Sequence, residues 1–331
     1  MAVLTDRRAV LLACREEQLD SLLALRRIAA HLGDLPRLGP TDAQRPDGRR
    51  PGAALVCDDE ATTAHLVRLG VPVLHLSSTP FTPAATATLT PLSAPTPLSP
   101  PTPPDPTGAV LSRAHWPGWL DRPPGVRPTG LLAPTRLTRN RDRRGALLLL
   151  SLWGVPGSEA ESFTARRLPA LIDEAVRRTG CCTVICDTSL DLVRAVTAGL
   201  PGTTVVRAAD TNVDARHAES ELLLASPTMA ALALARARRA PLAFLPPLGP
   251  TQRALAEQLS RLLPIPTLDP TTPPDVAQPT GPGAPARPSD RAVWLPPSPE
   301  VQWAPLGPEL DDLRGAQSVA RTVRQLLLAP L

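Results

Sequence analysis

The chain has 331 residues, of which 43% are hydrophobic, so it is long enough for two domains that each bury a core. Its net charge is only +4, and Asp and Glu are spread among the basic residues, all of which are Arg. No stretch combines dense basic charge with aromatic residues, which argues against a nucleic-acid-binding protein.

The first part of the chain alternates apolar strands with helices. Continuous apolar runs predict strands at 9–14, 53–57 and 71–76, each covered on both faces. Between them, the spacing of apolar residues predicts one helix that ends at Gly33 and a short one that ends near Leu69. Such a series builds a doubly wound parallel sheet, so residues 1–138 are predicted to form a Rossmann-like α/β domain. The Pro-rich residues 80–107 are predicted to be a disordered insert in it.

A second alternating series begins at Gly145. Strands are predicted at 146–152, 181–186, 203–206, 222–225 and 242–245, and helices at 159–179, 190–198, 210–220, 228–238 and 252–263. We therefore predict a second Rossmann-like domain over 139–331. It includes a Pro-rich segment at 265–308 and a terminal amphipathic helix at 311–328.

Two doubly wound domains closed by a terminal helix resemble the GT-B fold of glycosyltransferases. The segments that carry the resemblance are "ELLLASPTMAALALARARRAPLAFLPP" with "GPTQ", "LLLLSLWGVPGSEAESF" and "RPPGVRPTGLLAP". More narrowly, the chain resembles cytosylglucuronic acid (CGA) synthases. This resemblance implies transfer of glucuronic acid or a related sugar from a UDP donor to a nucleobase or another small acceptor. It also implies a mechanism without a metal, and with no cofactor beyond the UDP-sugar.

The sequence also departs from that family pattern. A Gly-Gly turn and an acidic residue that holds the ribose are common in such donor sites. Here the turn is Ser226-Pro227, and residues 228–240 contain no Asp or Glu. The departures leave open an alternative, a non-catalytic relative that assists or regulates a partner transferase. A protein partner therefore stands beside the UDP-sugar and the small acceptor among the expected partners.

The donor side is predicted around the helix that starts after Ser226. We expect Ser226 to cap this helix, with Pro227 at its first position. The amides near Thr228 and Met229 would then be open to a diphosphate, because a helix start favours an anion. A plain helix cap explains the same residues. The resemblance adds Gln252, whose amide suits sugar hydroxyls, although an exposed Gln at a helix start fits equally well.

Two other segments leave predicted strands at their carboxyl ends. Ser151 and Gly154 follow one strand, where Gly would let the backbone approach a phosphate or would only form a turn. Near the N-terminus, Glu16 and Glu17 are candidate catalytic groups that take a proton from the acceptor, with Arg15 near the donor phosphates. Acidic residues in the first turn of a helix are the simpler interpretation of this segment.

Three further polar residues and the cysteines complete the prediction. We interpret His75 as a structural residue, His217 as a surface residue, and Asp187 as a cap of the next helix or a ribose contact. The five Cys residues lack zinc spacing, which predicts buried thiols in a reducing, cytoplasmic compartment. No apolar run is long enough to span a bilayer, so no membrane association is expected.

Overall fold

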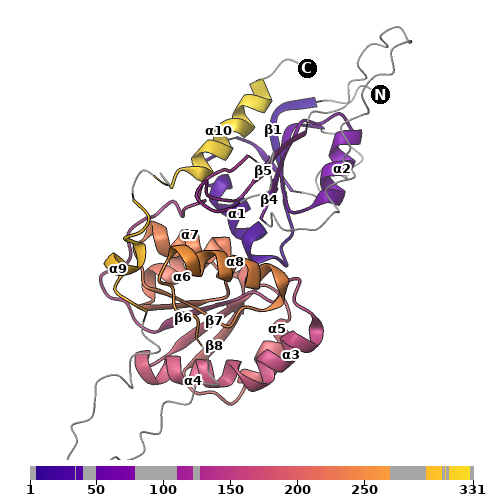
Figure 1. The fold of residues 1–331 in the computed structure, drawn as a ribbon. Coiled ribbons are helices and arrows are strands. Elements are labelled where there is room, and N and C mark those ends of the chain that lie inside the picture. Colours follow the sequence, from indigo (N-terminus) through magenta and orange to yellow (C-terminus); the bar gives the residue numbers. More distant parts are fainter. Residues whose placement is uncertain are drawn as a thin grey trace, which may run out of the picture. The chain divides into compact units, whose positions relative to one another are not determined.

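A computed structural model of the chain describes residues 5–33, 35–39, 50–78, 110–121, 127–268, 296–307, 310 and 313–328. The chain forms two compact units (Figure 1). The first unit comprises Met1–Arg15, Ser21–Leu132 and Arg314–Leu331, and the second comprises Glu16–Asp20 and Ala133–Leu313. The insert predicted at 80–107 lies outside the described residues. Residues 269–295 of the predicted Pro-rich segment also lie outside them.

The first unit contains a five-stranded sheet in which every strand pair is parallel. Its strands are β1 (Thr5–Cys14), β2 (Arg37–Leu38), β3 (Arg50–Cys57), β4 (Val73–Ser77) and β5 (Val110–Ala114), in the spatial order β2-β1-β3-β4-β5. The three strands predicted from apolar runs are β1, β3 and β4. The sequence patterns did not predict the two edge strands, β2 and β5.

Helices cover both faces of the first sheet (Figure 1). Helices α1 (Leu19–Ala29) and α10 (Gly315–Leu328) pack on one face, and α2 (Glu60–Arg68) contributes to the apolar cluster on the other. The prediction placed the terminal helix in the second domain, and this is corrected by the structure. The apolar face of α10, including Val319 and Val323, packs with Val10 and Leu55 of the first sheet.

The second unit also has five strands that pair in parallel. They are β6 (Ala146–Leu150), β7 (Cys182–Cys186), β8 (Thr203–Arg207), β9 (Leu222–Ala225) and β10 (Leu242–Phe244), in the order β10-β9-β6-β7-β8. This is the order 3-2-1-4-5 of the dinucleotide-binding Rossmann fold, without the sixth strand. The fold class predicted from the sequence, two doubly wound α/β domains, is confirmed.

Helices lie on both faces of the second sheet (Figure 1). One face carries α3 (Gly157–Arg166), α4 (Leu168–Thr179) and α5 (Leu190–Thr197); the other carries α6 (Val213–Glu219), α7 (Met229–Ala237) and α8 (Gly249–Leu262). A 3-10 helix at Ala208–Asp210 and the short α9 (Pro299–Trp303) complete the unit. The single helix predicted at 159–179 is instead α3 and α4, separated at Arg167. Pro169 lies in the first turn of α4 and cannot donate to the carbonyl four residues earlier.

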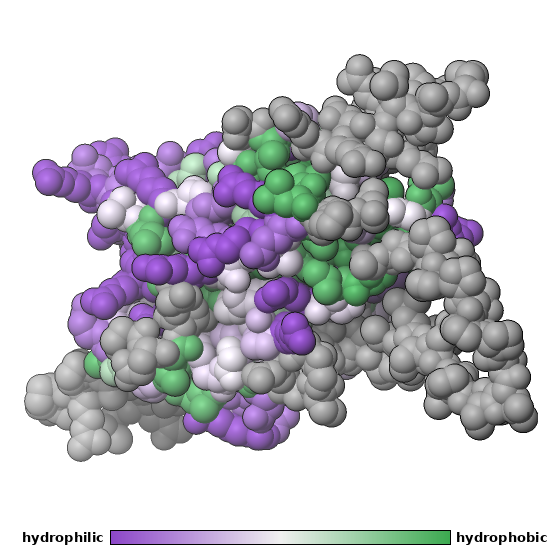
Figure 2. All heavy atoms as spheres, turned by 90° about the horizontal axis from the view of Figure 1, so that it is seen from above, coloured by the Kyte–Doolittle hydropathy of each residue, from purple (hydrophilic) through white to green (hydrophobic). Residues whose placement is uncertain are grey.

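The surface is mixed in character. Figure 2 shows hydrophobic atoms in patches interspersed with hydrophilic ones on the face that it presents. The large apolar side chains that are exposed in the described residues are Leu111, Leu137, Trp153, Leu262, Val301, Leu310 and Leu328. Among the helices that the structure describes, none has the length and apolar character needed to cross a bilayer. None of the five Cys residues forms a disulfide, and Cys181 is exposed rather than buried.

The strand order indicates where ligands are expected. In open parallel sheets, binding sites form outside the carboxyl ends of the strands, at the point where the strand order reverses. In the first unit this point lies between β1 and β3, and in the second between β6 and β9. Polar residues of the chain follow the strands at each switch point.

Candidate functional site

Two serines meet at the switch point of the second unit. The backbone N–H of Ser151, after β6, donates to Oγ of Ser226, after β9, at 3.0 Å. The Oγ of Ser151 donates in turn to Oδ2 of Asp187 at 2.6 Å. Both serines are buried, with exposed fractions of 6% and 1%. Both serines were predicted to lie on the donor side, and their hydroxyls bond inside the second unit.

Asp187 is the centre of this network. Its Oδ1 accepts from the N–H of Leu152 at 2.9 Å and of Thr188 at 2.7 Å, and its Oδ2 also accepts from the N–H of Leu19 at 3.3 Å. Burial raises the pKa of Asp187, while these hydrogen bonds act in the opposite direction. The prediction that Asp187 caps the next helix is wrong, because the N-cap of α5 is Ser189.

The start of α7 differs from the prediction in its N-cap residue and in the group that its first amides contact. The N-cap is Thr228 rather than Ser226, and its Oγ1 accepts from the N–H of Ala231 at 3.2 Å. The next amides are not open to an external anion. The N–H of Ala230 donates to Oδ1 of Asp20 at 2.7 Å, and that of Met229 donates to Oδ2 of Asp20 at 3.2 Å. A carboxylate of the chain thus lies where a diphosphate was expected.

Gln252 and Gly154 lie beside this network and differ from each other. Gln252 is in the first turn of α8 and is 6% exposed. Its Oε1 accepts from the N–H of Leu248 at 3.0 Å, and its Nε2 donates to the carbonyl of Ser151 at 2.8 Å. Gly154 has a φ of +69° and lies in an exposed loop, with open space where a Cβ would point. Both polar atoms of the Gln252 amide therefore bond to the backbone, whereas Gly154 leaves room for a ligand.

The predicted catalytic segment lies between β1 and α1. Glu16 and Glu17 form an exposed turn, and neither makes a hydrogen bond or ion pair with any residue that the structure describes. They belong to the Glu16–Asp20 segment of the second unit, the segment that carries the Asp20 carboxylate to α7. Arg15 instead belongs to the first unit, where its guanidinium contacts Glu60 at 3.4 Å.

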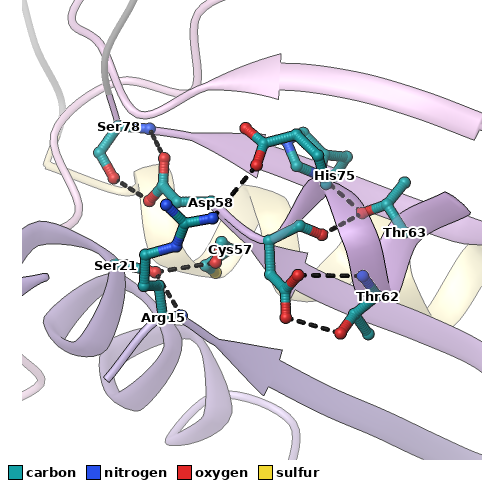
Figure 3. Close-up of polar contacts among 10 residues, drawn as sticks. Arg15, Ser21, Cys57, Asp58, Thr62, Thr63, His75 and Ser78 are labelled. Carbon is teal, nitrogen blue, oxygen red and sulfur yellow. Dashed lines mark hydrogen bonds and ion pairs between the residues drawn. The ribbon is translucent and has the colours of Figure 1, made fainter. Parts of the chain in front are cut away.

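A buried carboxylate follows β3 at the switch point of the first unit (Figure 3). Asp58 has a φ of +52° and is 6% exposed. Its Oδ1 accepts from the N–H of Ser78 at 2.7 Å, and its Oδ2 accepts from the hydroxyl of Ser78. Ser21 lies next to it and donates to the carbonyl of Cys57 at 2.8 Å. Burial raises the pKa of Asp58 to about 6, although its hydrogen bonds favour the charged form.

The ring of His75 lies beside Thr63 in the same unit (Figure 3). Thr63 Oγ1 lies 2.9 Å from the carbonyl of Asp59 and 2.8 Å from Nδ1 of His75. Since the hydroxyl has one proton and a carbonyl can only accept, Thr63 donates to Asp59 and accepts from His75. Nδ1 therefore carries the proton and Nε2 has the lone pair. Burial lowers the pKa of His75 and so favours the neutral ring.

The remaining buried imidazoles are His115 and His217. In the second unit, His217 is buried, so the prediction that it lies on the surface is wrong. Its Nδ1 lies 3.1 Å from the guanidinium of Arg238 and must accept from it. His115 follows β5 and is fully buried. Neither ring nitrogen has a hydrogen-bond partner among the described residues, and burial lowers the pKa of His115 to about 3. The ring is therefore neutral at neutral pH.

The sequence patterns did not identify three of these residues as site residues: Asp20, Asp58 and His115. Asp20 is one of several acidic residues near the start of α1, and its contact with α7 joins residues about 210 positions apart. Asp58 directly follows the strand predicted at 53–57, and its carboxylate accepts from the N–H of Ser78. A left-handed Asp directly after a buried strand is a structural signal that the sequence alone does not reveal.

No group of three or more His, Cys, Asp or Glu side chains is placed to hold a metal ion within the part of the chain that the structure describes. Asp187 and Asp58 are each surrounded by N–H and O–H donors, which suit a carboxylate rather than a cation.

Comparisons with known proteins agree with the fold. A family model described as "CGA synthase-related protein" matches residues 10–331. The solved glycotransferase of kitacinnamycin matches with a TM-score of 0.50 at 13% identity, over 96% of this chain and 98% of that chain. Spinosyn forosaminyltransferase SpnP (TM-score 0.46, 12% identity, 97% and 95% covered) and MurG of Acinetobacter baumannii (0.41, 13%, 96% and 99%) also match. The fold is that of the GT-B glycosyltransferases. No curated protein matched the sequence.

Proposed function

This chain belongs to the CGA synthase-related family, and we propose that it binds a nucleotide sugar and transfers the sugar to a small acceptor. The finer proposal is a UDP donor that carries glucuronic acid or a related sugar, with a nucleobase or similar molecule as acceptor. The family and the GT-B fold support a transferase of this class.

One observation supports a particular position for the donor diphosphate in the second unit. Two successive amides at the start of α7 converge on one carboxylate, that of Asp20. Backbone N–H groups at a helix start, aided by the helix dipole, stabilise an anion in the same way when the anion is a phosphate. The β9–α7 connection lies at the switch point of the sheet, where a nucleotide is expected.

The proposed chemistry uses groups of this chain. The α7 amides would stabilise the departing diphosphate, since charge grows on it as the bond to the sugar breaks. Gly154, at the neighbouring strand end, would admit the phosphates or sugar close to the backbone. Glu16 and Glu17 remain our candidates for the group that takes the acceptor proton, because both are exposed and lie in the segment that reaches α7.

Release of UDP tests this proposal directly. The full chain, incubated with UDP-glucuronic acid or another UDP-sugar, should release UDP only when an acceptor such as cytosine is added. Glu16→Ala combined with Glu17→Ala should lower the rate at least tenfold while UDP binding is retained. The proposal is wrong if no acceptor in a panel of nucleobases and small alcohols gives UDP release, and if calorimetry detects no UDP binding to the wild-type chain or to Asp20→Ala at millimolar concentration.

A second candidate function is a non-catalytic relative that assists a partner transferase. The observation that favours it is the internal use of the predicted donor groups, because the side chains of Ser151, Ser226, Thr228 and Gln252 all bond within the second unit. Each residue of α7 from Met229 to Arg236 is also buried. Under this alternative a protein partner copurifies with the chain, and Ser226→Ala and Glu16→Ala leave its effect on that partner unchanged. Acceptor-dependent release of UDP contradicts it.

A further inference from the structure

The contact between Asp20 and α7 is unusual for a helix start. Helix α7 already has its own cap, because Thr228 satisfies the N–H of Ala231. The amides of Met229 and Ala230 would ordinarily face water or a ligand. Instead Asp20, more than 200 residues earlier in the sequence, presents one carboxylate oxygen to each of them. All three first-turn amides of α7 are thus satisfied by side-chain oxygens.

Asp20 is held in place by more than this one contact. The adjacent N–H of Leu19 donates to the buried carboxylate of Asp187, which also accepts from Ser151. Asp20 itself is only 9% exposed. The 16–20 segment therefore donates one amide to Asp187 and accepts two amides of α7 through Asp20. These hydrogen bonds hold it to the rest of the second unit at the switch point.

We propose that Asp20 is an internal competitor for the donor diphosphate. This inference rests on the proposed function, because it assigns the same α7 amides to the donor. A carboxylate and a phosphate each present two oxygens to neighbouring N–H groups, so the two cannot occupy the amides of Met229 and Ala230 together. The donor binds only in those molecules in which Asp20 has left α7, and its apparent affinity falls in proportion to their share.

Substitution of Asp20 separates the competitor from the site. Asp20→Ala removes both oxygens and leaves the amides to an external anion. Asp20→Asn keeps one acceptor oxygen and the side-chain size. The matched control is Asp191→Asn, an exposed acid in the first turn of α5 in the same unit, which loses one charge at a distance from α7 in the chain. Binding of UDP and of inorganic pyrophosphate to each full-length variant is measured by calorimetry at one pH and ionic strength.

The expected result is that Asp20→Ala binds both probes at least tenfold more tightly than the wild type. Asp20→Asn should give a smaller gain, and Asp191→Asn should match the wild type within twofold. Circular dichroism and thermal unfolding check that the variants fold, and Asp20→Asn decides the question if Asp20→Ala does not.

The other outcomes distinguish this inference from the proposed function. Equal UDP affinity for the wild type and for the Asp20 variants overturns the competitor role, while UDP binding by the protein survives. Tighter pyrophosphate binding in Asp20→Ala, with no UDP binding by any variant, supports the competitor role and removes the support for a nucleotide donor. Absence of binding of either probe to folded Asp20 variants overturns the inference, because the vacated amides then accept no phosphate.

Discussion

Replacing Asp58 with Asn should change how the stability of the first unit depends on pH. The carboxylate is buried at the switch point, and its hydrogen bonds to Ser78 do not fully offset the cost of burying its charge. Asn is similar in size and tolerates the left-handed φ of +52°. Its carbonyl oxygen can still accept from the N–H of Ser78, and its NH₂ group can donate to the hydroxyl. The substitution therefore removes the charge and keeps the shape.

The direction follows from proton binding by the two states. The pKa of Asp58 rises from 3.8 to about 6 on folding, so the folded protein binds this proton more tightly than the unfolded chain. The stabilisation is complete below pH 3.8 and is lost as the pH rises through about 6. A shift of about two units corresponds to about 3 kcal/mol. Relative to the wild type, Asp58→Asn should thus gain about 3 kcal/mol between pH 4 and pH 7.

Denaturant unfolding at intervals from pH 4 to pH 7.5 measures this difference. Hydrogen exchange of peptides from β3 and β4 locates the effect in the first unit. The exposed Asp191→Asn variant, in the second unit, controls for the loss of one negative charge. A difference between Asp58→Asn and the wild type that stays constant across this range, or that falls with rising pH, would refute the reasoning.

Three further substitutions test other buried polar groups. Asp187→Ala strands several buried amides, and it should destabilise the second unit by about 2–4 kcal/mol in denaturant unfolding; no loss would contradict the network. Gln302→Leu leaves the N–H and C=O of Leu242 unpaired at the β10 edge, with a similar expected cost in the same assay. His115→Leu should leave thermal stability at pH 7 unchanged or higher, because the imidazole has no partner among the described residues. The advantage of His115→Leu should grow as the pH falls from 6.5 toward 3, since the lowered pKa of His115 makes the folded wild type resist protonation.

The regular elements with continuous apolar runs were predictable from the sequence. Strand β9 has the predicted bounds, Leu222–Ala225, because four buried apolar residues lie between polar neighbours. Strand β5 could not be found in this way. It follows a Pro-rich stretch, and its Leu111 and Ser112 are both exposed, so neither an alternating nor a continuous apolar pattern marks it.

The candidate site was predictable in position but not in its contacts. The strand series locates Ser151 and Ser226 at the carboxyl ends of β6 and β9, and these residues do meet at the switch point. Their partners depend on which hydroxyl faces which amide, and periodicity carries no information about that. The capping error shows this: a Ser-Pro-Thr sequence permits a cap at either hydroxyl, and the Ser151 amide takes the first one.

The Asp20 contact also affects how a simple binding experiment should be interpreted. If Asp20 leaves α7 in about 1% of molecules, a donor binds about 100-fold more weakly than it would to the vacated site. Weak UDP binding by the wild type is then expected of an active transferase whose donor site is occupied by Asp20. It is also expected of a non-catalytic relative that binds no donor. The two functions separate only when Asp20 is removed, because the vacated amides of a transferase should gain the nucleotide, whereas those of a non-catalytic relative should gain at most a simple phosphate.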